Sequence, residues 1–217
     1  MDYSTMIDEI CGPLGYDPID PIALARTTRW LNASCLQMAE KYDFPNLVHR
    51  NGSFTTIAGE VQDLTATAPA GLGGTFLRVL QDTIRIGQDT IPYKYKSYFD
   101  EIDPDRTYGG NASFFSAVGD GKIILWPAPG SGVVVSLDWM AKPATITAAT
   151  TEANMPFDTE FHETMVNGAR VRGMRYAGTG LWYNEQQIWF DELKRVYANA
   201  HGMKLFYSQI NARDLGT

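Results

Sequence analysis

Few residues in this 217-residue chain could carry out chemistry, and they are scattered along it. His162 and Glu163 are adjacent on a predicted helix, and such a pair begins the zinc-binding motif H-E-x-x-H. That motif needs its second histidine where this chain has Val166, so no zinc site is predicted. A serine nucleophile elbow needs G-x-S-x-G, whereas residues 129–132 read Pro-Gly-Ser-Gly.

Two other segments match ligand-binding loops in composition but not in spacing. The glycines at 71–74 lack the G-x-G-x-x-G spacing and the Lys-Ser/Thr of a phosphate loop, which favours a connector. Asp100, Asp103 and Asp105 are dense enough in carboxylates for calcium, the less favoured alternative, but they lack the glycine and terminal glutamate of an EF-hand. We therefore predict no catalytic residue, no cofactor and no metal, and hence a protein that is not an enzyme.

The charge and the cysteine content exclude further classes of protein function. The formal net charge is −7, and residues 157–217 contain seven acidic and seven basic residues, so the acidic excess lies in residues 1–156. Such a surface disfavours specific nucleic-acid binding, although it would suit a wall past which DNA slides. Cys11 and Cys35 have neither redox nor zinc spacing and are predicted to be buried thiols. The chain shows neither a secretory signal nor a membrane-spanning run, which predicts synthesis in the cytoplasm.

Arg170, Arg172 and Arg175 form the one basic concentration of the chain. Arg172 and Arg175 share a helical face. A solvated helix face and a contact with a subunit or partner both explain the cluster, and the sequence leaves the two open.

Predicted helices lie at both ends of the chain. A short helix over 4–11 should stop at Gly12-Pro13, and a longer one should begin at Asp20, a good N-cap, and end at Phe44-Pro45. A third helix is predicted from Pro156. A fourth should pack on it as an antiparallel hairpin through a turn at 178–180. The fourth helix has the strongest apolar periodicity of the chain, through Trp189, Leu193, Val196, Ala200, Met203, Tyr207 and Ile210.

The central part of the chain is predicted to be β-rich. Apolar runs at 114–118, 122–126 and 133–139 are separated by Gly-Asp-Gly and by a Pro/Gly-rich segment, which predicts a three-stranded meander. In the last run Val133, Val135, Leu137 and Trp139 share one face, which should be buried, and Val134, Ser136 and Asp138 share the other, which should be at least partly solvated.

Shorter β segments precede this meander. Residues 53–57 and 60–67 are predicted to form a loose hairpin, and residues 76–80 and 83–86 a second strand pair. Residues 93–98 should form an edge strand before an acidic turn at 100–105.

The predicted fold class is therefore α+β, a long-helix bundle of the N-terminal helices and the C-terminal helical hairpin with a small central antiparallel β-module. Residues 1–46 and 155–217 would form the helical part, and residues 47–154 an inserted β-rich part.

The order of several motifs is similar to that of a known family. These motifs are Trp30-Leu31-Asn32 with Gln37 and Phe44-Pro45, the segment 53–64, the core G-D-G-K-I-I-L-W-P-A-P at 119–129, Trp139 with Lys142-Pro143, and Met155-Pro156-Phe157. Together they resemble the head-to-tail connector, or adaptor, proteins of tailed bacteriophages. The similarity extends over nearly the whole chain, although residues 66–74 are richer in alanine and glycine than the family pattern and leave the strand count of 47–110 open.

The resemblance implies a structural virion protein of the neck, between head and tail. It would form a homo-oligomeric ring, dodecameric in the family, that binds the portal protein, extends the DNA channel and offers a surface to a tail or nozzle protein. We expect the C-terminal tail to dock the portal through Lys204, Phe206, Tyr207, Ile210, Arg213 and Leu215. We expect Asp103, Asp105, Tyr108, Arg172 and Arg175 to contact a neighbouring subunit or the tail.

Two alternatives remain at the level of sequence. The first is another tail structural component, such as a tail-completion, tail-tube or baseplate protein. The second, less favoured, is a carbohydrate-binding module, because Trp126, Trp139 and the tyrosines at 93, 95, 98 and 108 could form an aromatic platform.

Overall fold

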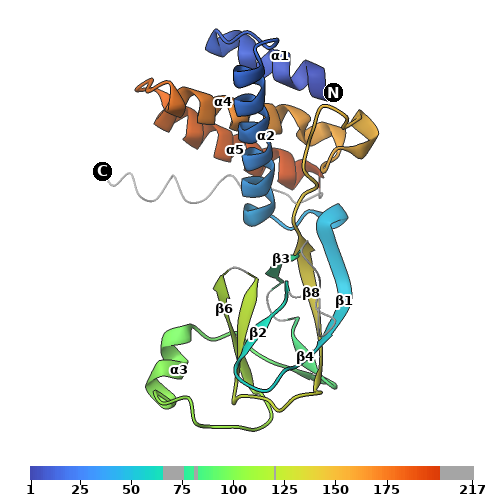
Figure 1. Cartoon of the computed structure of the whole chain (residues 1–217), viewed down its shortest axis with the longest axis vertical. Coiled ribbons are helices and arrows are strands. Elements are labelled where there is room, and N and C mark those ends of the chain that lie inside the picture. Colours follow the sequence, from blue (N-terminus) through green and yellow to red (C-terminus); the bar gives the residue numbers. More distant parts are fainter. Residues whose placement is uncertain (66–75, 81–82, 120, 201–217) are drawn as a thin grey trace, which may run out of the picture. The chain divides into compact units, whose positions relative to one another are not determined.

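A computed structural model describes residues 1–65, 76–80, 83–119 and 121–200. The chain divides into two compact units. The helical unit comprises Met1–Tyr42 and Ala144–Thr217, and the β unit comprises Asp43–Pro143. Helices dominate the first and antiparallel sheets the second (Figure 1), which confirms the α+β class. Among the described residues, no helix is both long and apolar enough to cross a membrane.

Helix α1 (Tyr3–Leu14) is longer than the sequence predicts, because it continues through Pro13 to a left-handed Gly15. A proline inside a helix has no N–H to donate to the carbonyl four residues earlier, here that of Glu9. The Nε of Arg170 donates to this carbonyl oxygen over 2.8 Å. A side chain of another helix thus satisfies the group that Pro13 leaves without its partner.

Helix α2 (Pro21–Lys41) begins as predicted, because the Asp20 carboxylate accepts hydrogen bonds from the backbone N–H groups of Ile22 and Ala23. Its buried face includes Leu31, Cys35 and Met38. The helix packs on α1 and α4, and Asn32 binds the backbone of Ile146 at 2.7 and 3.0 Å in the segment that leads back into this unit.

Helix α4 (His162–Tyr176) is the centre of the helical unit and packs against α1, α2 and α5 (Trp182–Ala200). It starts later than predicted, because a single 3₁₀ turn, Thr159–Phe161, precedes it. The Arg175 guanidinium lies over the Trp182 ring near the turn, and Trp189 Nε1 donates to the Thr164 carbonyl further along. Through these contacts α4 and α5 lie antiparallel, and α2 crosses both helices in Figure 1.

Two glycines let α4 approach its neighbours closely. A Cβ at Gly168 would lie 2.1 Å from Ser34 Oγ and 2.5 Å from the Trp189 ring, and a Cβ at Gly173 would lie 2.3 Å from Leu14. At Gly168 a side chain would collide with the Trp189 ring, whereas at Gly173 the flexible end of Leu14 would have to move, so Gly168 is the position that most directly permits the close packing of α4.

The β unit contains two antiparallel sheets built around a long strand and a short hairpin. The first sheet has the order β1-β8-β4-β5, with β3 also paired to β8, and the second has the order β2-β7-β6. The strands are β1 (Val48–Thr55), β2 (Val61–Asp63), β3 (Phe76–Val79), β4 (Arg85–Ile86), β5 (Asp89–Thr90), β6 (Phe114–Gly119), β7 (Lys122–Trp126) and β8 (Val134–Ala141).

The pairing of these strands corrects the sequence predictions. The hairpin of 114–118 with 122–126 exists as β6–β7, but β8 does not continue it into a meander and instead pairs with β1 in the other sheet. The hairpin predicted over 53–67 is also wrong, because β1 pairs with β8 and β2 with β7. Likewise β3 and β4 do not pair with each other, and both pair with β8.

The physical reason for these corrections is β8 itself. Buried and less buried residues alternate from Val134 to Trp139, so Val135, Leu137 and Trp139 are buried as predicted, and Met140 and Ala141 are buried as well. Val133, predicted on the same face, lies just before the strand and is half-buried. Its inward residues join Phe54 of β1 and Phe115, Ile123 and Leu125 of the second sheet in one hydrophobic cluster. Using both edges of one long strand buries more apolar surface than a separate local hairpin would.

Two predictions for the segment before β6 are also wrong. The segment 93–98 is not an edge strand, because α3 (Lys96–Ile102) begins inside it, and the expected acidic turn at 100–105 is the end of this helix and the loop that follows. The glycine-rich connector at 71–74, the part of the last helical stripe beyond Ala200 and the proposed docking tail lie outside the described residues.

Candidate partner-binding surfaces

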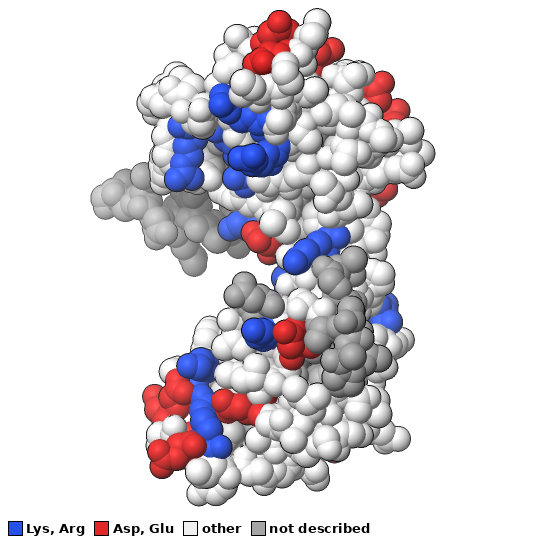
Figure 2. Space-filling model, viewed as in Figure 1, with Lys and Arg blue, Asp and Glu red and all other residues white. Residues whose placement is uncertain are grey.

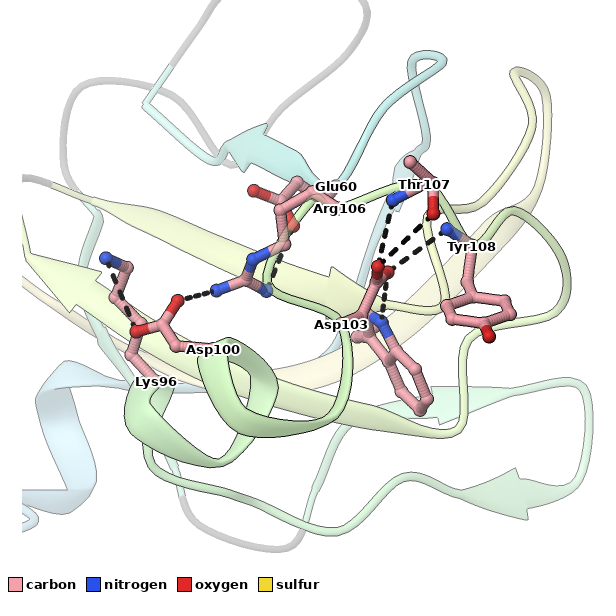
Figure 3. A network of polar contacts seen from close by, with 8 residues as sticks. Glu60, Lys96, Asp100, Asp103, Arg106, Thr107 and Tyr108 are labelled. Carbon is pink, nitrogen blue, oxygen red and sulfur yellow. Dashed lines mark hydrogen bonds and ion pairs between the residues drawn. The ribbon is translucent and has the colours of Figure 1, made fainter.

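Asp103 is the buried anchor of the loop that follows α3, with 2% of its surface exposed. Its carboxylate accepts hydrogen bonds from the backbone N–H of Thr107 at 3.0 Å and of Tyr108 at 3.1 Å, and from the indole Nε1 of Trp126 at 3.1 Å (Figure 3). A carboxylate that closes on the chain four and five residues later fixes the loop in one conformation.

These contacts keep Asp103 ionised. Burial acts to raise its pKa, but the hydrogen bonds from Trp126, Thr107 and Tyr108 outweigh burial and hold the pKa below its ordinary value.

Arg106 holds the outer side of the same loop. Its backbone has φ = 53°, in the left-handed region that non-glycine residues rarely adopt. Its guanidinium pairs with Glu60 at 3.1 Å and with Asp100, and lies 5.7 Å from the centre of the Phe99 ring. Asp100 also faces Lys96 at 3.9 Å (Figure 3), so two cations already neutralise this carboxylate.

Of the three residues in this loop that were predicted to contact a neighbouring subunit or the tail, only two are at the surface. Asp105 and Tyr108 are exposed, Tyr108 by 61%, and could meet another protein. Asp103 could not meet another protein, because it is buried and its carboxylate oxygens already accept hydrogen bonds. The prediction that Asp103 lies in a contact surface is therefore corrected: it anchors the loop from inside. Within the described part of the chain, no group of three His, Cys, Asp or Glu side chains could hold a metal ion.

The helical unit carries a second surface, a groove between α2, α4 and α5 of about 400 Å³. We call it the arginine groove. Each helix contributes one face to it, and the lining includes Arg29 and Gln37 of α2, Arg172 and Arg175 of α4, and Trp182 and Gln186 of α5. Trp30, Tyr176 and Trp189 form its aromatic walls, and Gly168 lies between them. Figure 2 shows basic side chains gathered over this part of the helical unit.

The groove holds more positive charge than its surroundings compensate. Among the described residues, none of Arg29, Arg172 and Arg175 has a carboxylate within ion-pair distance. Arg172 donates to the Ala33 carbonyl at 3.1 Å and to Gln37, but its Nε is buried without a partner in that part of the chain. Burial lowers the pKa of Arg172, Arg175 adds to this, and Glu40 acts in the opposite direction. The site therefore favours an anionic group.

The three arginines predicted as one cluster have two different roles. Arg170 points to the other side of α4, where it holds Glu9 of α1 through the carbonyl oxygen and, at 3.4 Å, through the carboxylate. Arg172 and Arg175 both line the groove, with the Arg175 guanidinium 5.0 Å above the Trp182 ring. The tail residues Lys204, Phe206, Tyr207, Ile210, Arg213 and Leu215 lie outside the described residues.

Sequence reasoning missed Arg29, Trp182 and Gly168 as members of this surface. Gly168 gave a usable signal, because a glycine inside a helix carries an energetic cost that close packing can offset. Arg29 and Trp182 gave none, since each is a single exposed or half-buried residue on a different helix, and only the packing brings them together.

These observations define a class, a two-unit α+β protein with polar and aromatic surfaces suited to contacts with other proteins. The family model of the SU10 adaptor protein matches residues 1–211. The chain belongs to the SU10 adaptor protein family, and the resemblance to phage head-to-tail adaptors is thereby confirmed. It is a phage adaptor, a structural component of the virion. Among curated proteins, no relative matches the chain.

Proposed function

We propose that this protein is the subunit of a homo-oligomeric adaptor ring in the neck of a tailed phage. The ring joins the portal to the tail or nozzle protein and extends the DNA channel. The observation that carries this proposal is the match of the adaptor family over residues 1–211, nearly the full chain. By analogy with the phage adaptor family, the proposed ring has twelve subunits.

The two units suit a ring that has partners on both sides. The C-terminal tail combines apolar Phe206, Tyr207, Ile210 and Leu215 with basic Lys204 and Arg213, a composition suited to docking on the portal. The loop anchored by Asp103 presents Asp105 and Tyr108 on a fixed backbone, which suits contact with a neighbouring subunit or the tail. A preformed loop loses little conformational entropy on binding.

The net negative charge expected of a DNA channel wall is shared by both units. The β unit has 11 acidic and 8 basic residues, and the helical unit has 14 and 10. Both units therefore contribute to the negative charge, so the excess assigned by sequence to residues 1–156 does not single out one unit as the channel wall. A net negative ring still repels DNA on average, which suits passage without retention.

The alternative function is that of another structural component of the tail. The assembly expected for it differs from that of an adaptor. A tail-tube protein would stack into tubes, and a hexameric ring would also contradict the adaptor role. The carbohydrate-binding alternative loses support, because Trp139 is 7% exposed and the indole N–H of Trp126 is already bound to Asp103.

The test combines the purified protein with the portal protein of the same virus. Negative-stain images should show a second ring on the portal ring, and mass measurement should give its subunit number. Deletion of residues 206–217 should leave a folded protein that no longer binds the portal, whereas a control that lacks only residues 216–217 should bind normally. Unchanged binding of the longer deletion would remove the docking role of the tail, and the absence of any ring on the portal would contradict the adaptor function.

A further inference from the structure

The helical unit has opposite charges at its two ends. The arginine groove lies toward the C-terminal end of α4, around Arg172, Arg175 and Tyr176. Asp158, Glu160 and Glu163 lie at the other end, on the turn before α4 and in its first helical turn, and all three are exposed. Helix α4 has 15 residues and is about 22 Å long at 1.5 Å per residue, and Glu163 and Arg172 lie nine residues apart on it, about 14 Å along its axis.

The acidic end is as poorly compensated as the groove. Among the described residues, Asp158, Glu160 and Glu163 form no ion pair. In Figure 2, basic side chains gather on one side of the helical unit and acidic side chains show at its opposite edge. A favourable helix dipole accounts for one acid and one base on α4, but it does not account for a groove to which two further helices contribute.

We infer that the arginine groove receives the acidic segment 158–163 of a second copy of this chain, in a head-to-tail contact. Arg29, Arg172 and Arg175 face three carboxylates that are not neutralised within their own copy. Because groove and segment lie at opposite ends of one unit, each copy can bind one neighbour at each end. Contacts of this kind form a closed ring when the rotation between copies allows it. The inference rests on the proposed ring and assigns residues to its subunit interface.

Two other acidic segments fit the groove less well. Asp17 and Asp20 flank the exposed Ile19, but this loop adjoins the groove of its own copy, since the Tyr16 ring lies 6.0 Å from that of Trp30. A head-to-tail contact needs a different face. Asp100 of the β unit is already paired with Arg106 and Lys96.

A single-stranded nucleic acid is also anionic, but the aromatic residues of the groove do not suit one. Trp30 and Trp189 are 9% and 2% exposed, so they form walls rather than platforms on which bases could stack. The more exposed rings of Tyr176 and Trp182 already have the guanidinium groups of Arg26 and Arg175 over one face, at 4.4 and 5.0 Å. Arg172 already donates to Ala33 and Gln37, so its guanidinium is fixed for one ligand geometry rather than free to follow a backbone.

The test reverses each side of the contact in the full chain. One variant carries Arg29→Glu and Arg175→Glu, and a second carries Asp158→Lys and Glu160→Lys. A matched control, Lys194→Glu with Arg195→Glu, makes the same charge change as the first variant at exposed residues of α5 outside the groove. Circular dichroism establishes that each variant is folded. Sedimentation velocity over a concentration series and native mass spectrometry then measure self-association.

Wild type and control should self-associate, and each reversed variant should remain monomeric because like charges meet at the contact. An equal mixture of the two reversed variants should restore oligomers that contain both chains in equal number, since every groove then meets a segment of opposite charge. Higher salt should weaken wild-type assembly, because exposed ion pairs are screened.

Four outcomes would overturn the inference. They are assembly of the groove variant at the wild-type level, failure of the mixture to restore assembly, a wild-type chain that stays monomeric throughout the series, and binding of a single-stranded oligonucleotide that the groove reversal abolishes. If the groove variant still forms its ring on the portal, this interface is wrong and the adaptor function stands. If wild type forms no ring on the portal, the adaptor function itself fails.

Discussion

The two units of this protein place polar side chains against the backbone in different ways. In the helical unit the half-buried Arg170 donates to the carbonyl that Pro13 leaves free, and the buried Trp189 donates to the Thr164 carbonyl. His162, 2% exposed, is within 3.1 Å of the Phe157 carbonyl oxygen through Nε2. In the β unit the main buried polar group is a charged carboxylate, Asp103, which holds an irregular loop.

The units also differ in how their cores are assembled. Helix α4 contacts three other helices and is buried on nearly every side, so the helical unit depends on the fit of one helix. The β unit depends on one strand, β8, which pairs with β1 on one edge and with β3 and β4 on the other. Each unit therefore has a single central element, and a substitution in either element should destabilise mainly its own unit.

The largest expected effect comes from Leu193→Asp in α5. Leu193 is fully buried, so the substitution places an unpaired charge in the core and should cost more than about 4 kcal/mol, enough to unfold the helical unit. Hydrogen exchange followed by mass spectrometry should show loss of protection in α1, α2, α4 and α5. The control Lys194→Asp, at an exposed neighbouring position, should keep that protection. A stable, fully protected Leu193→Asp variant would show that this stripe is not core.

The second test acts on the β unit through Leu137→Ala in β8. Leu137 is fully buried, and truncation of a buried leucine costs about 2–5 kcal/mol through lost burial and the cavity left behind. The measured stability of the β unit should fall by that amount in a denaturant titration. Val134→Ala, at a position 58% exposed on the same strand, should change it by less than about 0.5 kcal/mol. Equal effects at the two positions would contradict the role of β8 as the central strand.

The third test compares two glycines of the helical unit. Gly168→Ala should destabilise it by about 1–2 kcal/mol, because overpacking against Ser34 and Trp189 costs more than the gain in helix propensity. Gly180→Ala in the turn before α5, where a Cβ would meet nothing within 4 Å, should change the stability by less than about 0.5 kcal/mol. Thermal unfolding of the two variants checks the difference. A gain in stability from Gly168→Ala would mean that α4 packs less closely than described.

The smallest effects should appear as different pH responses of the two units. Burial lowers the pKa of His162, and the amino group of Met1 adds to this, although the carbonyl of Phe157 and the carboxylates of Glu152 and Asp158 oppose the shift. An unfolded chain takes up a proton below the ordinary value of 6.5 and the folded chain resists it, so the helical unit should lose stability as the pH falls below 6.5. The pKa of Asp103 is also lowered, from 3.8, so its contribution is complete above that pH and is lost only below it.

The helical unit should therefore weaken first as acid is added. Hydrogen exchange at stepped pH would resolve the two units, and His162→Gln should reduce the response near pH 6.5 without altering the β unit. Asp103→Asn, which cannot carry the charge, should remove the response of the loop below pH 3.8. If the β unit loses protection before the helical unit, the assignment of these two groups is wrong.

The sequence by itself determined the features that depend on neighbouring residues. Asp20 followed by Pro21 predicts where α2 begins, and the alternation along the run 133–139 predicts the burial of Val135, Leu137 and Trp139. Local backbone hydrogen bonding and side-chain period govern both features, so they can be read within one turn or one strand. The motif order from Trp30 to Phe157 was likewise enough to indicate the adaptor family.

Only the tertiary structure decided which elements meet. Val48 pairs with Met140, and no property of either residue selects that partner over a nearer strand, because pairing depends on the total apolar area that the sheets bury together. The same holds for the sites. Asp103 looked like a surface acid until Trp126 was placed beside it, and Arg29, Arg175 and Trp182 form one groove only because glycines on α4 allow three helices to pack closely. Such contacts join residues far apart in the chain, and no local pattern records them.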